Sequence, residues 1–119
     1  MSTLLEQLVA ICARPVPHRL RERAARHLLD WLGCAIAGAV SEPGKIARRV
    51  LPDDGDVPLA GGGSASPRTA ALVNGCLGNV LEMDDIHRTA ILHPGPVVVP
   101  AALAVARDAP SLLDAIVRG

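Results

Sequence analysis

The segment Ser66–Met83 reads SPRTAALVNGCLGNVLEM and carries the clearest helix signal in this chain of 119 residues. Ser66 followed by Pro67 is a typical helix start, because a serine hydroxyl caps free backbone amides and proline fits the first helical position. Apolar and small residues continue from there at helical spacing, and they include Ala70, Ala71, Val73, Leu77, Gly78 and Leu81. The segment therefore predicts a helix over 67–83 that packs closely against its neighbours.

Helical patterns also precede this segment. A first helix is expected to be capped by Ser2 and to run through Cys12, and an amphipathic core helix is expected over 18–37. The core helix places apolar residues on one face, namely Leu20, Ala24, Leu28, Trp31, Leu32, Ala35 and Ile36. A short helix is expected near 45–51, and 57–60 is a candidate short strand.

Glycine and proline divide the rest of the chain. The sequence GGGS at 61–64 lacks the Gly-Lys-Ser/Thr ending of a phosphate-binding loop, so we interpret it as a turn. After a loop over 84–94, a helix is expected to begin near Pro100, because proline clashes deep inside a helix. Ser111 is expected to cap a last helix over 112–118. The predicted fold class is all-α.

Composition argues against two classes of partner. Twelve basic and twelve acidic residues balance to a net charge of zero, so we expect neither nucleic acid nor a membrane surface to be captured by uniform charge. Trp31 is the sole aromatic residue, which leaves no surface for stacking bases. No apolar run reaches the length of roughly 20 residues that a membrane-spanning helix needs.

The cysteines indicate the compartment. Cys12, Cys34 and Cys76 form no CxxC pair, and no basic signal-peptide segment follows Met1. We therefore expect three free, buried thiols in the reducing cytoplasm, with a catalytic cysteine as the alternative.

The candidate site is an acidic-histidine segment. Glu82, Asp84, Asp85, His87 and His93 place three carboxylates and two imidazoles in one loop between apolar helices. These groups are the side chains best suited to moving protons near neutral pH. His93 also lies shortly before a predicted helix start, where free N–H groups favour bound anions. The segment predicts proton transfer on an acidic substrate.

Simpler interpretations remain open for the same residues. Asp84 or Asp85 alone could cap or end a helix, and His87 could be a solvated loop residue. A divalent metal site is a further alternative, although the spacing fits no standard ligand signature.

Several segments together resemble the MmgE/PrpD family. The similar stretches are Ala70–Gly75, Glu82–His87, His93–Gly95, Pro100–Leu103 and, upstream, Asp30–Gly38. The family includes 2-methylcitrate dehydratase, cis-aconitate decarboxylase and iminodisuccinate epimerase. The resemblance implies proton transfer next to a carboxylate of a small polycarboxylate, with no cofactor and no obligatory metal. It also implies a large helical domain with a smaller α/β lid, paired as a homodimer.

The resemblance implies roles for the candidate residues. His93 would act as an acid or base, and Glu82, Asp84 or Asp85 would contribute an acidic group. Our own hypothesis adds that Asp84 and Asp85 orient His93 or bind substrate, and that Glu82 and, as a weaker candidate, His87 contact substrate. Family members often have aspartate at Glu82 and threonine in place of Ile86, so the substrate is expected to differ from the best-known ones.

Residues 1–119 would form the N-terminal portion of the helical domain, without the lid. We expect a small subunit, or a fragment of a longer enzyme, that acts as a lyase or epimerase once a second polypeptide or a homodimer completes it. The alternative is a non-catalytic truncated homologue or helical dimerisation module.

Overall fold

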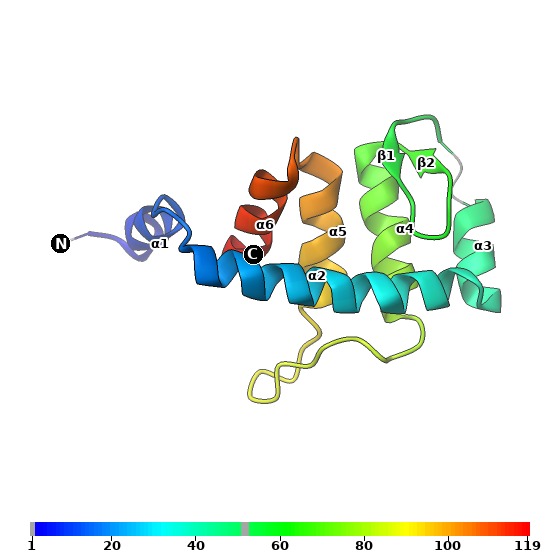
Figure 1. Cartoon of the computed structure of the whole chain (residues 1–119), viewed down its shortest axis with the longest axis horizontal. Coiled ribbons are helices and arrows are strands. Elements are labelled where there is room, and N and C mark those ends of the chain that lie inside the picture. The colour runs from blue at the N-terminus through cyan, green and yellow to red at the C-terminus, as the bar shows by residue number, and fades with distance from the viewer. Residues whose placement is uncertain (1, 51–52) are drawn as a thin grey trace.

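A computed structural model describes residues 2–50 and 53–119 of the chain, and most of them are helical. The helices are α1 (Leu4–Cys12), α2 (His18–Ala39), α3 (Glu42–Val50), α4 (Pro67–Asn79), α5 (Gly95–Val105) and α6 (Ala109–Arg118). Figure 1 shows α2 as a long helix with α3, α4, α5 and α6 standing along one side of it. The all-α fold class is confirmed, and within the described residues no helix is long and apolar enough to cross a membrane.

The first half of the chain differs from expectation at element ends. Thr3, not Ser2, caps α1, because its hydroxyl accepts a hydrogen bond from Glu6 N and Glu6 bonds back in a capping box. The third helix begins at Glu42, earlier than expected, while Leu51 lies outside the described residues.

The GGGS segment is confirmed as a turn. It joins β1 (Val57–Pro58) to β2 (Ser64–Ala65), which pair in an antiparallel hairpin, so the candidate strand is shorter than expected. Gly61, Gly62 and Gly63 all have positive φ, a conformation that glycine adopts without steric cost.

The helix predicted over 67–83 ends at Asn79, because the chain turns sharply there. Glu82 takes a left-handed φ of 51°, and its amide bonds back to Asn79 O at 2.8 Å. A residue with this backbone conformation cannot continue a right-handed helix. Ser66 is confirmed as the cap of α4.

The last two helices begin earlier than expected. The fifth begins at Gly95, so Pro100 lies in its interior rather than in its first turn. Proline at this position removes a helical hydrogen bond and is tolerated here at that cost. The sixth begins at Ala109 with Asp108 as cap, and Ser111 completes a capping box from inside the helix.

The core lies where α2 crosses α4 and α5. Its buried members are Trp31, Ala35, Ala39, Val73, Leu77 and Val99. Glycines allow a close approach: a Cβ on Gly38 would lie 2.0 Å from Leu77 O, and one on Gly78 would lie 2.3 Å from Trp31 Nε1. The close packing predicted from the small residues of α4 is therefore confirmed.

Two residues expected in the core, Leu32 and Ile36 of α2, are exposed instead. Helix α1 buries none of its residues, and Leu4 is 83% exposed. Among the free thiols only Cys34 is buried, while Cys76 is exposed, so the expectation of three buried thiols was wrong.

Asp53 forms hydrogen bonds to the start of α4, and the stability that these bonds add should depend on pH. Its carboxylate accepts from Ser66 N at 2.7 Å, Ser66 Oγ at 2.5 Å and Thr69 Oγ1 at 2.7 Å. These bonds lower the pKa of Asp53 below its ordinary value of 3.8, with the Ser66 hydroxyl as the largest cause. A carboxyl group whose pKa is lower in the folded state adds stability at pH values above its ordinary pKa. This stability is lost as the pH falls through the folded-state pKa.

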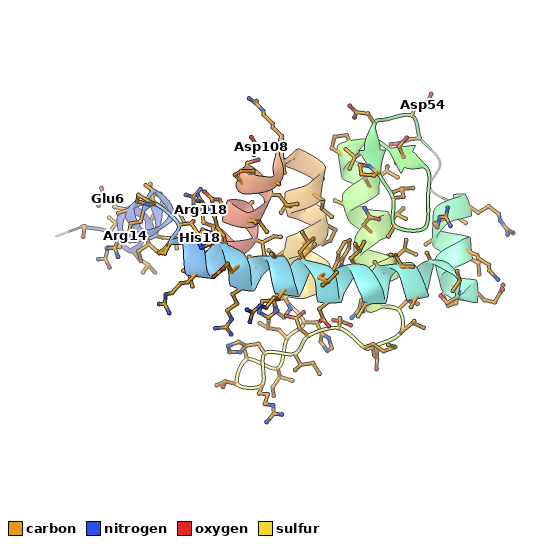
Figure 2. The ribbon with its side chains drawn as sticks, in the orientation of Figure 1. Glu6, Arg14, His18, Asp54, Asp108 and Arg118 are labelled. Carbon is orange, nitrogen blue, oxygen red and sulfur yellow. The ribbon has the colours of Figure 1, made fainter. Side chains whose placement is uncertain are left out.

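We therefore expect Asp53→Asn to lower the melting temperature by a few degrees near pH 7. The difference from the wild type should shrink as the pH falls below 3.8. Asp54→Asn is the matched control, because Asp54 lies on an exposed loop (Figure 2) and makes no side-chain hydrogen bond in the part of the chain that the structure describes. Equal melting temperatures for both variants at neutral pH would contradict the prediction.

Candidate active site

The loop between α4 and α5 leaves the layer of standing helices and passes to the other side of α2 (Figure 1). A tight turn folds the loop back on itself: His87 N bonds to Leu92 O at 2.9 Å and Ile91 N bonds to His87 O at 2.8 Å. Ile91 has a φ of 51°, which is strained for a β-branched residue. The turn returns the chain toward the end of α4, and His93 follows directly.

Asp84 and His93 form a hydrogen-bonded pair. Asp84 Oδ2 lies 2.7 Å from His93 Nδ1, and the Asp84 side chain is only 1% exposed. Its other oxygen, Oδ1, accepts from Asn79 Nδ2 at 3.3 Å. Both carboxylate oxygens thus have partners, as a buried charge requires.

This pairing determines which nitrogen of His93 can react. An ionised carboxylate can only accept, so Nδ1 carries the hydrogen and Nε2 remains for other partners. A carboxylate bonded to Nδ1 also stabilises the imidazolium that forms when Nε2 takes a proton. The pair therefore has the arrangement of a general acid–base catalyst.

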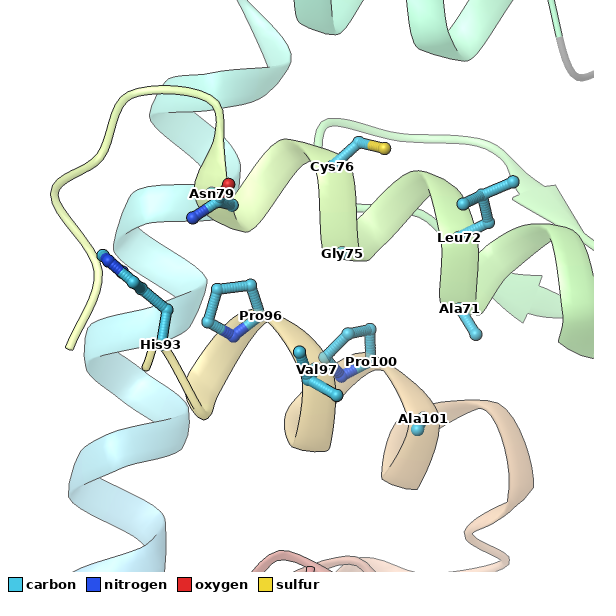
Figure 3. Close-up of a pocket in the computed structure, with 10 residues that line it drawn as sticks. All are labelled: Ala71, Leu72, Gly75, Cys76, Asn79, His93, Pro96, Val97, Pro100 and Ala101. Atoms are coloured by element: carbon cyan, nitrogen blue, oxygen red, sulfur yellow. The ribbon is translucent and has the colours of Figure 1, made fainter. Parts of the chain in front are cut away.

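His93 borders a surface pocket of about 580 Å³ between α4 and α5. Figure 3 shows Asn79 and His93 at one end, with Leu72, Val97 and Pro100 among its apolar lining residues. No lysine or arginine lines this pocket in the described part of the chain. Carboxylates are usually held by cationic side chains, so the pocket lacks the groups that would bind an anionic substrate.

Comparison with known proteins assigns the chain to a family. Residues 3–119 match the model of the MmgE/PrpD N-terminal domain. The chain belongs to the MmgE/PrpD family. It is 30% identical over 95 residues to the cis-aconitate decarboxylase-like protein oryM of Aspergillus oryzae, an alignment that covers 76% of this chain and 20% of the relative. The chain thus spans about a fifth of that relative, and no solved structure matches it.

Glu82, Ile86 and His87 do not line the pocket beside His93. Glu82 is exposed in the turn after α4, and Ile86 is 58% exposed. Ile86 and His87 border a second pocket of about 330 Å³ together with Asp85 and Arg23. His87 Nδ1 accepts from Ala90 N at 3.1 Å, which helps to hold the tight turn. The structure therefore brings Asp84 to His93, but it does not bring His87 into the same pocket.

Asn79 was missed from the sequence. The available signal was an asparagine shortly before an acidic run, but asparagine is common near helix ends. Its contact with Asp84 depends on how the loop folds back, and no local pattern shows this.

Cys34 does not fit the alternative of a catalytic cysteine. Burial raises the pKa of the Cys34 thiol, and the nearby carboxylates of Asp30 and Asp84 raise it further, whereas a reactive cysteine needs a lowered pKa. Within residues 2–50 and 53–119, no three His, Cys, Asp or Glu side chains converge as metal ligands.

The Asp85 carboxylate bonds to the first amide of α5, which is the helix-end role of its alternative interpretation, although Pro94 holds the N-cap position. Its Oδ1 accepts from Gly95 N at 3.0 Å, and a carboxylate at a helix N-terminus is favoured by the helix dipole. We expect Asp85→Ala to cost about 1 kcal/mol of unfolding free energy. Asp85→Asn, which keeps an acceptor, should recover most of this loss in urea denaturation. Equal stability of Asp85→Ala and the wild type would show that the cap contributes nothing.

Proposed function

We propose that this chain supplies the acid–base pair of a cofactor-independent lyase or epimerase that acts on a small polycarboxylate. The observation that carries the proposal is the 2.7 Å contact between His93 Nδ1 and the buried carboxylate of Asp84. Membership of the MmgE/PrpD family and the name of the Aspergillus relative support the substrate class.

Each of the reactions considered moves a proton between His93 Nε2 and a carbon next to a substrate carboxylate. In a dehydration or an epimerisation, His93 Nε2 takes a proton from the carbon next to a substrate carboxylate, and Asp84 stabilises the imidazolium. In a dehydration, the imidazolium then gives this proton to the leaving hydroxyl group, which departs as water while the C=C bond forms. In an epimerisation, an acid supplied by the polypeptide that completes the site protonates the opposite face of the same carbon, and His93 keeps the first proton until it is released to solvent. In a decarboxylation, a C–C bond breaks to release carbon dioxide, and His93 Nε2–H protonates the resulting carbanion. Exposed Glu82 and His87 remain proposed substrate contacts.

Further polypeptide must complete such a site. The pocket beside His93 is open and lacks cationic side chains, whereas catalysis needs convergent groups and exclusion of water. Apolar side chains flank it on both helices: Leu72 is 54% and Val97 is 70% exposed. We propose that the remaining helices and lid, in the same or a second polypeptide, or a second copy of this chain, pack on this face.

The test is a proton-exchange assay. The chain would be co-expressed with the product of the neighbouring reading frame and incubated in deuterated water with a panel of di- and tricarboxylates. Nuclear magnetic resonance would follow loss of the C–H signal next to each carboxylate, together with loss of water or carbon dioxide. Exchange on at least one polycarboxylate is expected, and a folded assembly that exchanges none would refute the proposal.

A non-catalytic helical module is the second candidate. The exposed apolar residues of α1 favour it, because large exposed apolar surfaces commonly mark interaction sites. The two functions differ in one outcome: a dimerisation module would assemble normally while showing no exchange with any polycarboxylate.

A further inference from the structure

Asn79 connects the acid–base pair to the rigid part of the fold. It is the last residue of α4, next to Gly78, which packs directly against buried Trp31. Asp84 and His93, in contrast, belong to the irregular loop. The Asn79 side chain therefore links a packed helix to a carboxylate in the loop.

The contacts of Asp84 are divided between its two oxygens. Asn79 Nδ2 donates to Oδ1, while His93 Nδ1 lies at Oδ2. Two partners on opposite oxygens restrict rotation of the carboxylate about its Cβ–Cγ bond. Only the NH₂ end of the amide can face an ionised carboxylate, because two acceptors repel each other. The amide thus selects the oxygen that Asp84 presents to His93.

We infer that Asn79 is a positioning residue for the acid–base pair. By holding Asp84, it keeps His93 in the tautomer with hydrogen on Nδ1 and leaves Nε2 free to exchange protons with a ligand. Asn79 itself need not touch substrate. The inference rests on the proposed function of His93, but it concerns a ring state that can be measured without turnover.

The test measures the His93 tautomer in the whole chain by ¹⁵N magnetic resonance of labelled histidines. Buffer about two pH units above the ordinary imidazole pKa keeps neutral rings in the majority. The wild type is expected to show His93 mainly as the Nδ1–H form. Asn79→Leu, similar in size but without a donor, is expected to lower the ratio of Nδ1–H to Nε2–H forms about tenfold, the typical effect of one charge-assisted hydrogen bond.

Two comparisons separate positioning from a general structural effect. Asn79→Gln keeps the amide on a longer arm and should retain most of the Nδ1–H form, whereas Asn79→Ala should behave like Asn79→Leu. His87 is an internal reference, because its Nδ1 accepts from Ala90 N and its hydrogen must lie on Nε2. Its ratio should stay constant in every variant. The His93 ring signals are identified as those that are missing from the spectrum of His93→Gln.

The outcomes distinguish this inference from the proposed function. An unchanged His93 ratio in Asn79→Leu, or an equal fall in Asn79→Gln, overturns the positioning role. A wild-type His93 with hydrogen mainly on Nε2 overturns both, because the pair with Asp84 would not exist as described. The expected ratios without any proton exchange on polycarboxylates support the positioning role and refute the proposed function alone.

Discussion

Replacing His93 with glutamine should lower the rate of proton exchange on the polycarboxylate substrate by about 10²- to 10⁴-fold, the usual contribution of a general acid–base side chain. Glutamine keeps hydrogen-bonding capacity at this position but cannot take up a proton from a carbon acid. The turnover number and its ratio to the Michaelis constant should fall together, because the lost interaction acts in the transition state.

His18→Gln is the matched control for this variant. His18 lies at the start of α2, its side chain is 84% exposed, and its nearest acidic partner is Glu22 at 3.8 Å. Its replacement should leave the exchange rate unchanged. Retention of the wild-type rate in His93→Gln would show that another group moves the proton.

Replacing Gly38 with alanine should have the largest effect on stability, a loss of about 3 kcal/mol in the free energy of unfolding. An added Cβ would lie 2.0 Å from the backbone oxygen of Leu77, so α2 and α4 would have to separate. A backbone carbonyl cannot swing aside as a flexible side chain can. Since small domains are stable by only about 5–15 kcal/mol, this loss is a large share of the total.

Gly33→Ala tests the same change on the same helix without the clash. Nothing lies within 4 Å of a Cβ at Gly33, so alanine should stabilise the chain by about 0.5–1 kcal/mol through helix propensity. Urea denaturation followed by the fluorescence of Trp31, the sole aromatic residue, measures both variants. Equal effects of the two substitutions would mean that α2 and α4 do not cross at Gly38.

Local sequence chemistry predicted most helices but not all of their ends. Ser66 and Pro67 correctly marked the start of α4, because a cap and a first-turn proline act within a few residues. The prediction that a helix begins near Pro100 was wrong because the preference of proline for a first turn is local. Its place inside α5 depends on packing against α4. Ser111 was expected to cap the last helix, but Asp108 holds the cap position three residues earlier and accepts a hydrogen bond from Ser111 N.

The candidate site likewise combines features that the local sequence predicts with contacts that it does not predict. From the sequence alone follow a helical chain of the MmgE/PrpD type, a glycine turn and a loop rich in carboxylates and imidazoles, because each depends on neighbouring residues. Only the tertiary structure decided that Asp84 contacts His93, that Asn79 joins them and that His87 faces another pocket. These contacts depend on how α5 docks beside α4 and on the strained turn at Ile91, which no nearest-neighbour pattern encodes.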